Sequence, residues 1–249
     1  MGPNARVAVY YAPRPDDPLF AEAAAWLGRD PEGDAPVPQP LMPDIEAVTA
    51  EPRRYGFHAT LKPPMRLAEG RQWFDLLEAA TTLASRMAPF ALPELAVSDV
   101  FGFLALRETV PCAPLQALAD ACVAQLDPFR AQPSDEELAR RRRARLTPQQ
   151  DAMLVRWGYP YVFESWFFHM TLTRRLNVAE KAVLLPSAKR YFARAIAVQR
   201  RVEDICLFIQ DSAGAPFMVA KRLPLLGASC PRSTGAPRSG PTQGAQRRE

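Results

Sequence analysis

The two histidines of this chain lie in the same short pattern. The sequence holds 2 histidines, which begin the segments His58–Leu61 and His169–Leu172, each with an apolar residue, then threonine, then leucine. Alternate residues of a β-strand point to the same face, so a strand formed by either segment presents an imidazole beside a hydroxyl. The apolar residues between them then enter the core. The repeated pattern therefore favours folds that contain two similar strands, each with one polar face.

The predicted elements fall into two similar blocks around a helical middle. Alternating apolar and β-branched residues predict strands at 6–12, 57–62, 97–106, 165–173, 202–210 and 217–223. Apolar spacing and capping residues predict helices at 18–27, 70–87 and 114–126, and further helix starts at Ser134, Thr147 and Asn177. This order predicts the α+β class, with two similar lobes that each contain a small sheet and helices.

The composition is that of a globular protein, with 48% hydrophobic and 23% charged residues. From residue 228 onward the chain lacks apolar periodicity, so we expect a disordered tail over 228–249. The formal net charge is +4 at pH 7, but that tail holds four arginines and one glutamate. The rest of the chain is therefore nearly neutral, and its overall charge gives no argument for nucleic-acid binding.

No segment of the sequence predicts a membrane anchor or a signal peptide. The best apolar candidate, 161–172, is interrupted by Glu164 and His169 and is shorter than the roughly 18 residues that a membrane span needs. The N-terminal residues lack the apolar region and cleavage site of a secretory signal. We expect a soluble, cytoplasmic protein.

Metal-binding residue types are scarce in the chain. The 4 cysteines show no Cys-x-x-Cys spacing, and two histidines without a nearby carboxylate or cysteine cluster fall short of the three protein ligands of a catalytic zinc. We therefore expect no metal and no other cofactor, although a metal site remains an alternative use of the two histidines.

Two imidazoles on facing walls of a cleft supply a general base and a general acid. With an ordinary pKa of about 6.5, one imidazole takes a proton from water or a ribose hydroxyl while the other protonates the leaving oxygen. Threonine hydroxyls between them hydrogen-bond the phosphoryl oxygens. We predict that His58, Thr60, His169 and Thr171 are catalytic residues for phosphodiester chemistry. The competing interpretation is that both histidines are structural.

Both motifs match the His-x-(Thr/Ser)-x pattern of the 2H phosphoesterases, a superfamily that the sequence resembles over most of its length. The segments Glu51–Lys62, Asp127–Arg130, Arg156–Tyr161 and Phe168–Thr173 are similar to a subgroup assigned to phosphonate metabolism. The resemblance implies metal-independent cleavage or transfer at 2′,3′-cyclic or related cyclic phosphates, carried out by the two histidines and two threonines.

The same resemblance implies an arrangement for the whole fold. It is a bilobal, pseudo-symmetric α+β fold in which two small antiparallel sheets with flanking helices surround a central cleft. We expect one such domain over 1–227, with lobes of about 1–110 and 111–227, and leave open whether strands are exchanged between the lobes.

Several residues near the motifs are candidates for substrate contacts. Lys62 shares the predicted face of His58, and Thr173 shares that of His169. Arg54 and Tyr55 precede the first motif and Arg174 follows the second, where each borders the expected cleft. We predict that all five residues bind substrate, although a solvated surface position is the simpler alternative for the arginines and the lysine.

Two features cannot be assigned from the sequence. Tyr10 and Tyr11 alternate on the first strand, so only one of them faces the cleft. The basic run Arg140–Arg145 is interpreted as the solvated face of a short helix, with a phosphate-facing role as the alternative.

We expect the substrate to be a small cyclic phosphate of a ribosyl compound, with a role in phosphonate catabolism. Only four lysines are present, whereas a protein that grips several RNA phosphates needs a basic track interleaved with aromatic residues. RNA 2′,3′-cyclic phosphodiester cleavage or ligation is the first alternative, and a non-catalytic nucleotide-binding module is the second. No protein partner and no membrane partner are predicted.

Overall fold

The structure is a computed structural model and describes residues 2 and 4–228. Apart from residue 228 itself, the predicted tail at 228–249 lies outside the described residues. In the described part of the chain, no helix is long and apolar enough to cross a membrane.

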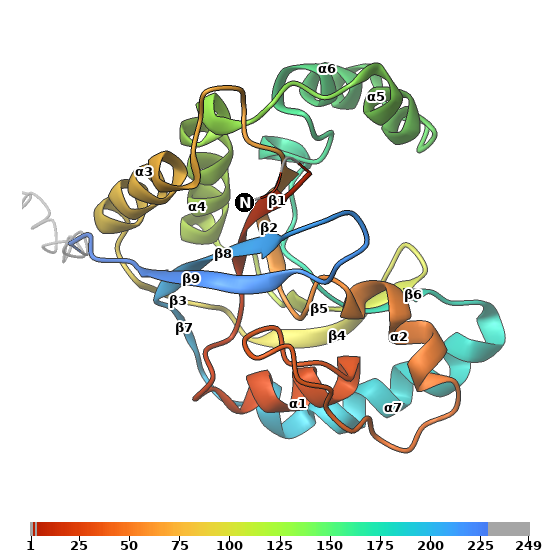
Figure 1. Cartoon of the computed structure of the whole chain (residues 1–249). Helices are drawn as coiled ribbons and strands as arrows, with labels where there is room; N and C mark the ends of the chain where they lie inside the picture. Colours follow the sequence, from red (N-terminus) through yellow and green to blue (C-terminus); the bar gives the residue numbers. More distant parts are fainter. Residues whose placement is uncertain (1, 3, 229–249) are drawn as a thin grey trace, which may run out of the picture.

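Nine strands and seven α-helices make up the described chain (Figure 1). The strands are β1 (Arg6–Tyr11), β2 (Ala59–Met65), β3 (Phe90–Ala91), β4 (Leu95–Val100), β5 (Phe103–Glu108), β6 (Met170–Arg175), β7 (Arg201–Val202), β8 (Asp204–Gln210) and β9 (Met218–Pro224). The helices are α1 (Pro18–Leu27), α2 (Ile45–Arg53), α3 (Trp73–Arg86), α4 (Ala113–Gln125), α5 (Asp135–Arg142), α6 (Pro148–Trp157) and α7 (Val178–Ile196).

Seven of the strands form one antiparallel sheet in the order β4-β5-β6-β2-β1-β8-β9, and β3 pairs with β7 in a second, two-stranded sheet. Strands from the two halves of the sequence alternate in the large sheet, because β6 lies between β5 and β2, and β8 lies beside β1. The α+β class is confirmed. The sequence predicted two small sheets, and the structure has instead one large and one very small sheet. The division into two lobes stays a prediction.

The large sheet has the fewest registered residue pairs at its centre. Neighbouring pairs such as β1 with β8 or β4 with β5 share five or six registered positions, whereas β2 and β6 share a single one, Ala59 with Met170. The single pair joins a four-stranded part, β2-β1-β8-β9, to a three-stranded part, β4-β5-β6. Both histidines immediately precede the strands that meet there.

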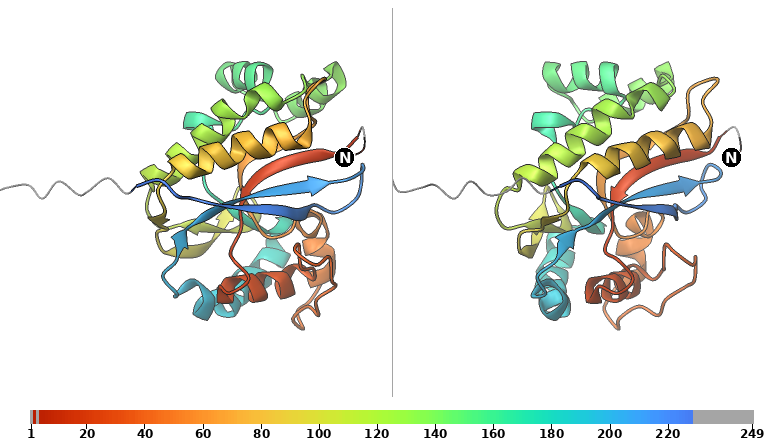
Figure 2. Two further views of the ribbon diagram at one scale, coloured as in Figure 1. Left: turned by 60° about the vertical axis from the view of Figure 1, so that its left-hand side comes forward. Right: turned by 90° about the vertical axis from the view of Figure 1, so that its left-hand side faces the viewer.

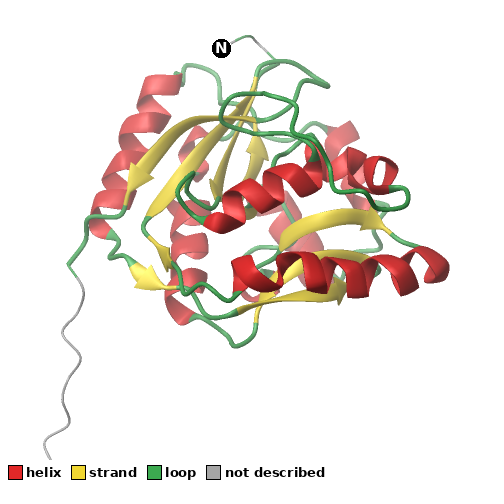
Figure 3. Ribbon diagram, turned by 90° about the horizontal axis from the view of Figure 1, so that it is seen from below, coloured by secondary structure: helices red, strands yellow, loops and turns green. Residues whose placement is uncertain are grey.

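Helices cover the two parts of the sheet separately. α3 and α4 pack against β9 and β2, whereas α7 and α2 pack against β4 and β6. In Figure 2 the α3–α4 pair lies on one side of the sheet and α1 with α7 on the other. Figure 3 shows α1 and α7 side by side in front of the strands. The apolar faces of these helices and the strands form one continuous core.

The helix starts predicted from capping residues are confirmed. The side chains of Ser134, Thr147 and Asn177 each accept a hydrogen bond from the third residue of the helix that follows, and the side chain of that residue accepts one in return. Each reciprocal pair satisfies backbone N–H groups that the helix itself leaves free. One helix was missed: α2 follows the proline-rich segment 31–43 and includes Pro52.

Candidate active site

The two motifs meet across the central strand pair. Ala59 lies opposite Met170 in antiparallel register. Continuation of this register by one residue in each direction places His58 opposite Thr171 and Thr60 opposite His169. Ala59 and Met170 are buried in the core, so the four polar side chains lie on the other face. Cβ atoms of directly opposed residues lie about 4.5–5.5 Å apart and diagonal ones about 7–8 Å apart.

The result is a crossed arrangement in which each imidazole is flanked by a hydroxyl from both strands. Three adjoining cavities agree with it. One of about 450 Å³ is lined by both His58 and Thr171, and one of about 510 Å³ by both Thr60 and His169. The third, of about 420 Å³, is lined by His58 and Thr60. All four side chains are half-buried, so they are accessible to a small ligand.

Each imidazole is fixed by the carbonyl two residues before it. His58 Nδ1 lies 2.8 Å from the oxygen of Gly56, and His169 Nδ1 lies 3.1 Å from that of Phe167. A carbonyl oxygen only accepts, so Nδ1 carries the proton and donates in both rings. In the neutral imidazole, Nε2 then has a free lone pair. The Thr60 hydroxyl lies 3.3 Å from Nε2 of His58.

Aromatic side chains hold both rings in place. His58 stacks on Tyr10 with ring centroids 3.7 Å apart, and His169 stacks on Phe167 at 4.7 Å. The contact also settles which tyrosine of β1 faces the site, because Tyr10 contacts His58 while Tyr11 packs in the core beside Phe168.

Two tryptophans, the buried Trp26 and the partly exposed Trp166, hydrogen-bond to the strands of the site. The indole N–H of Trp166 donates to the Thr60 carbonyl at 2.8 Å, and that of Trp26, on α1, donates to the Leu172 carbonyl at 3.0 Å. Each motif therefore has an indole donor bonded to its backbone. Such bonds restrict the orientation of the strand and hence of its polar side chains.

Burial favours the neutral form of both histidines. It lowers the pKa of His58 from 6.5 to about 4, where donation to Gly56 opposes the shift and the charge of His169 adds to it. It also lowers the pKa of His169, where donation to Phe167 opposes the shift and Arg107 adds to it. Both imidazoles are therefore neutral at pH 7 when the cleft holds no anion.

Lys62 does not lie on the His58 face, which corrects the prediction. The register steps from Tyr10 opposite Thr60 to Val9 opposite Lys62, so Leu61 and Lys62 together oppose one residue of β1. Such a β-bulge reverses the alternation after it. Lys62 is consequently buried, and its ammonium group donates to the Val123 carbonyl at 3.1 Å and to Asp127 at 3.3 Å.

The other predicted substrate contacts divide into two groups. Tyr55, Thr173 and Arg174 line the cavity that contains His58 and Thr171, although Thr173 is nearly inaccessible and its hydroxyl accepts from the backbone N–H of Leu104. Arg54 lines none of the three cavities, and its guanidinium donates to the Gly214 carbonyl, so its contact with substrate stays a prediction.

Sequence reasoning missed most of the residues that shape the cleft. Six aromatic residues line the cavity of Thr60 and His169, which we call the aromatic cavity: Phe101, Phe103, Tyr159, Tyr161, Trp166 and Phe167. Arg6, Arg140 and Arg141 line the cavity of His58 and Thr60, which we call the basic cavity. The interpretation of the 140–145 run as only a solvated face is therefore incomplete. The segment Arg156–Tyr161, which carries part of the family resemblance, includes Tyr159 and Tyr161 of the aromatic cavity. No local sequence pattern indicated the other residues that line the cavities.

A metal ion has few ligands at this site. Among residues 2 and 4–228, no group of three or more His, Cys, Asp or Glu side chains is close enough to hold a metal ion. Both Nδ1 atoms already donate to carbonyls, so only the Nε2 atoms remain free.

Comparison with known proteins identifies the family. DUF1045, described as a protein of unknown function, matches residues 60–218. The chain belongs to the DUF1045 family. The matched range includes both threonines of the motifs and His169, and it begins two residues after His58.

This DUF1045 protein is also similar to two curated proteins, each named "Ribose 1,5-bisphosphate phosphokinase PhnN". The one from Janthinobacterium sp. (strain Marseille) is 39% identical over an alignment of 241 residues, and the match covers 92% of this chain and 53% of the relative. The one from Laribacter hongkongensis (strain HLHK9) is 37% identical over 226 residues, which are 90% of this chain and 52% of the relative. The chain spans about half the length of the curated relatives it matches.

Solved structures similar to this DUF1045 protein include one described as a phosphoesterase and one of E. coli LigT complexed with NADP+. The first has a TM-score of 0.43 and 13% identity, and the second a TM-score of 0.41 and 11% identity. Each comparison covers 89% of this chain and 98% of the other. Both TM-scores lie below 0.5, so this likeness is weak.

Proposed function

We propose that this protein is a metal-independent phosphodiesterase that opens a small cyclic phosphate by two-histidine acid–base catalysis. The crossed arrangement of His58, Thr171, Thr60 and His169 carries the proposal, because it offers two Nε2 atoms and two hydroxyls to one phosphoryl group. In regular antiparallel pairing, diagonal neighbours such as His58 and His169 lie about 7–8 Å apart or somewhat less, which leaves room for one phosphate between the rings.

The reaction needs one neutral and one protonated imidazole. The neutral ring accepts a proton from water, whose oxygen attacks phosphorus. The ring P–O bond breaks, and the imidazolium donates its proton to the oxygen that leaves. Proton exchange with solvent restores both rings. The threonine hydroxyls donate to the non-bridging oxygens, on which negative charge grows in the transition state.

Binding of the phosphate favours uptake of the missing proton from solvent. Both imidazoles have lowered pKa values in the cleft without ligand, but a bound anion raises the pKa of a neighbouring imidazole. The substrate therefore promotes protonation of one histidine as it binds. The surroundings favour His58 as the base, since its pKa is lowered to about 4, and His169 as the acid.

We propose a ribosyl cyclic phosphate as the substrate, with a role in phosphonate catabolism. The motif resemblance implies this role, and the relatives' name refers to a phosphorylated ribose. That name also refers to a kinase, but the proposal does not extend kinase activity to this chain. None of its lysines follows a glycine, so the sequence lacks the Gly-Lys-(Ser/Thr) phosphate loop of many nucleotide-binding enzymes.

The test is a panel of ribosyl cyclic phosphates, with product identification, on the wild-type chain and on the His58→Ala and His169→Ala variants. We expect ring opening that survives exhaustive treatment with a chelator and is lost in both variants. Loss of activity on chelation, with rescue by zinc or manganese, would overturn the metal-independent mechanism. Binding without turnover would favour the nucleotide-binding module.

An RNA substrate is a separate outcome of the same panel. An oligoribonucleotide with a 2′,3′-cyclic end is compared with the small substrates across salt concentrations. If the oligonucleotide is preferred by orders of magnitude and the preference collapses with added salt, RNA processing replaces the small substrate.

A further inference from the structure

Three arginines face the reactive groups across the basic cavity. Arg6 precedes the buried part of β1, and Arg140 and Arg141 lie near the end of α5, so residues about 134 positions apart line one cavity with His58 and Thr60. Its volume is about 420 Å³, which exceeds the space that one phosphoryl group between the imidazoles requires. The cavity therefore extends the catalytic cleft toward a cationic wall.

None of these three guanidinium groups has a carboxylate partner among residues 2 and 4–228. Two acidic residues near α5 are paired with other arginines: Glu137 with Arg66 at 3.1 Å, and Asp151 with Arg142 at 2.6 Å. Arg6 donates to the neutral amide of Gln210 at 2.7 Å.

Aromatic rings hold two of these arginines in place. The guanidinium of Arg141 lies over the ring of Tyr159, 4.9 Å from its centroid, and that of Arg6 lies over Phe217 at 5.3 Å. Stacking fixes the plane of a guanidinium and leaves its N–H groups at the edge available to an anion. The helix that carries Arg140 and Arg141 is itself fixed by the reciprocal cap of Ser134 and Glu137.

The three positive charges are close enough to affect one another. Burial lowers the pKa of Arg141 and the charges of Arg140 and Arg6 add to the shift, whereas Tyr159 and the charge of Glu137 oppose it. The carboxylate that lines this cavity belongs to Glu51, which is exposed at the rim. Three cations against one rim carboxylate leave the cavity with excess positive charge, which a bound anion would neutralise.

We propose that the basic cavity binds a second phosphate of the substrate, so that the preferred substrate is a ribosyl cyclic phosphate with a phosphomonoester elsewhere on the same sugar. This inference rests on the proposed function. The cyclic phosphate lies between the imidazoles, and the phosphomonoester lies against Arg6, Arg140 and Arg141. Guanidinium groups suit this role because they donate in pairs to phosphate oxygens.

The experiment uses a matched pair of substrates: a ribosyl cyclic phosphate, and the same compound phosphorylated at its remaining primary hydroxyl. We expect the wild-type kcat/KM to favour the phosphorylated compound by about 10–100-fold, which is the net effect of about one charge-assisted hydrogen bond. The double variant Arg140→Gln, Arg141→Gln should lose most of this preference, mainly through KM.

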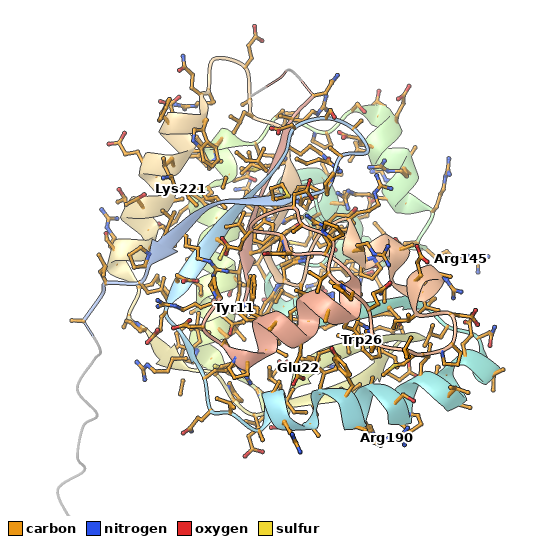
Figure 4. All side chains as sticks on the ribbon, turned by 60° about the horizontal axis from the view of Figure 1, so that its bottom comes forward. Tyr11, Glu22, Trp26, Arg145, Arg190 and Lys221 are labelled. Carbon is orange, nitrogen blue, oxygen red and sulfur yellow. The ribbon has the colours of Figure 1, made fainter. Side chains whose placement is uncertain are left out.

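The matched control is Arg143→Gln, Arg145→Gln. It removes the same charge from the same run, at two exposed residues that line none of the three cavities. In Figure 4 Arg145 lies at the outer edge of the molecule. The control should keep the full preference. If both double variants reduce the preference equally, only long-range charge is involved and the proposed second site is wrong.

The outcomes separate the two proposals. Equal turnover of both compounds by the wild-type chain would overturn the second site and leave the phosphodiesterase in place. No turnover of either compound would overturn the proposed function. Binding of the phosphorylated compound by calorimetry, weakened by the Arg140, Arg141 variant and not by the control, would then still support an anion site in this cavity. Absence of such binding would overturn both proposals.

Discussion

The two histidines share a local construction and differ in what surrounds them. Each donates from Nδ1 to the carbonyl two residues back, stacks on an aromatic ring and lies beside a threonine. Beyond that, His58 opens onto the basic cavity, whereas His169 opens onto the aromatic cavity. In the proposed function the repeated motif supplies the chemistry, and segments distant in the sequence distinguish the two ends of the cleft.

This difference between the two ends of the cleft predicts the orientation of a bound substrate. A phosphorylated end suits the guanidinium groups near His58, and an apolar or planar group suits the rings near His169. The two imidazoles can then hold different roles although their motifs are alike. Variants on the two sides of the cleft test whether this difference in surroundings affects function.

The largest expected effect is on catalysis. Replacement of His58 or of His169 by alanine should each reduce kcat/KM by about 100–10,000-fold, the usual contribution of a general acid or base. The double variant should be little worse than either single variant, because the two groups act in one step. Steady-state kinetics on a ribosyl cyclic phosphate measures both. If one single variant stays fully active, the comparison fails, because only one histidine then takes part.

The next prediction concerns stability and tests whether Lys62 has a structural role rather than a role in substrate binding. The Lys62→Met variant should unfold with a free energy lower by about 1–3 kcal/mol, because it removes one partner of a buried ion pair. Asp127 keeps Arg130 as a partner at 2.8 Å, which limits the loss. Chemical denaturation measures it. The folded variant should keep its KM, and a KM raised tenfold or more would return Lys62 to the substrate site.

These residues show where local sequence reasoning succeeds. The alternation of a strand was enough to place His58 and Thr60 on one face, and the repeat was enough to pair them with His169 and Thr171. It failed at Lys62, because one bulged residue changes the face of everything beyond it. The predicted strand ends before Pro63 and Pro64, although prolines inside a strand are typical of a bulge or an edge. The same alternation left Tyr10 and Tyr11 equivalent until the contact with His58 distinguished them.

Long-range contacts could not be predicted from one sequence. Arg140 and Arg141 reach the site because α5 lies next to the cavity that β1 and β2 line, and no pattern within α5 indicates that position. The central pair of β2 and β6 is likewise a contact between distant segments. Local patterns specify faces and caps, whereas the neighbours of a face depend on how the whole chain packs.

A smaller effect is expected in the pH dependence of stability. The pKa of His58 is about 4 in the folded protein and 6.5 ordinarily, so the unfolded chain binds more protons between these values. The stabilisation is therefore complete above about pH 6.5 and is lost as pH falls toward 4. On going from pH 7.5 to 5, Tm of the His58→Gln variant should fall by about 4–8 °C less than that of the wild-type protein, which corresponds to roughly 2 kcal/mol.

Thermal unfolding at the two pH values tests this directly. An Arg145→Gln variant serves as the control, since it removes a charge far from the histidine and should follow the wild-type curve. An equal or larger fall in the His58→Gln variant would mean that burial does not disfavour the protonated ring.

The smallest expected effect concerns the pKa of His169. Arg107 lies over the Phe167 ring at 5.2 Å, and that ring stacks on His169. Its charge lowers the pKa of His169, so Arg107→Gln should raise it and shift the corresponding limb of the pH profile of kcat/KM upward by a fraction of a pH unit. The limb that belongs to His58 should move less, because Arg107 affects the pKa of His58 only indirectly, through the charge of His169. Kinetics across the pH range measures both limbs in one series. An equal shift of both limbs would mean that the two imidazoles titrate as one coupled pair, and the separate roles inferred from their surroundings would then be wrong.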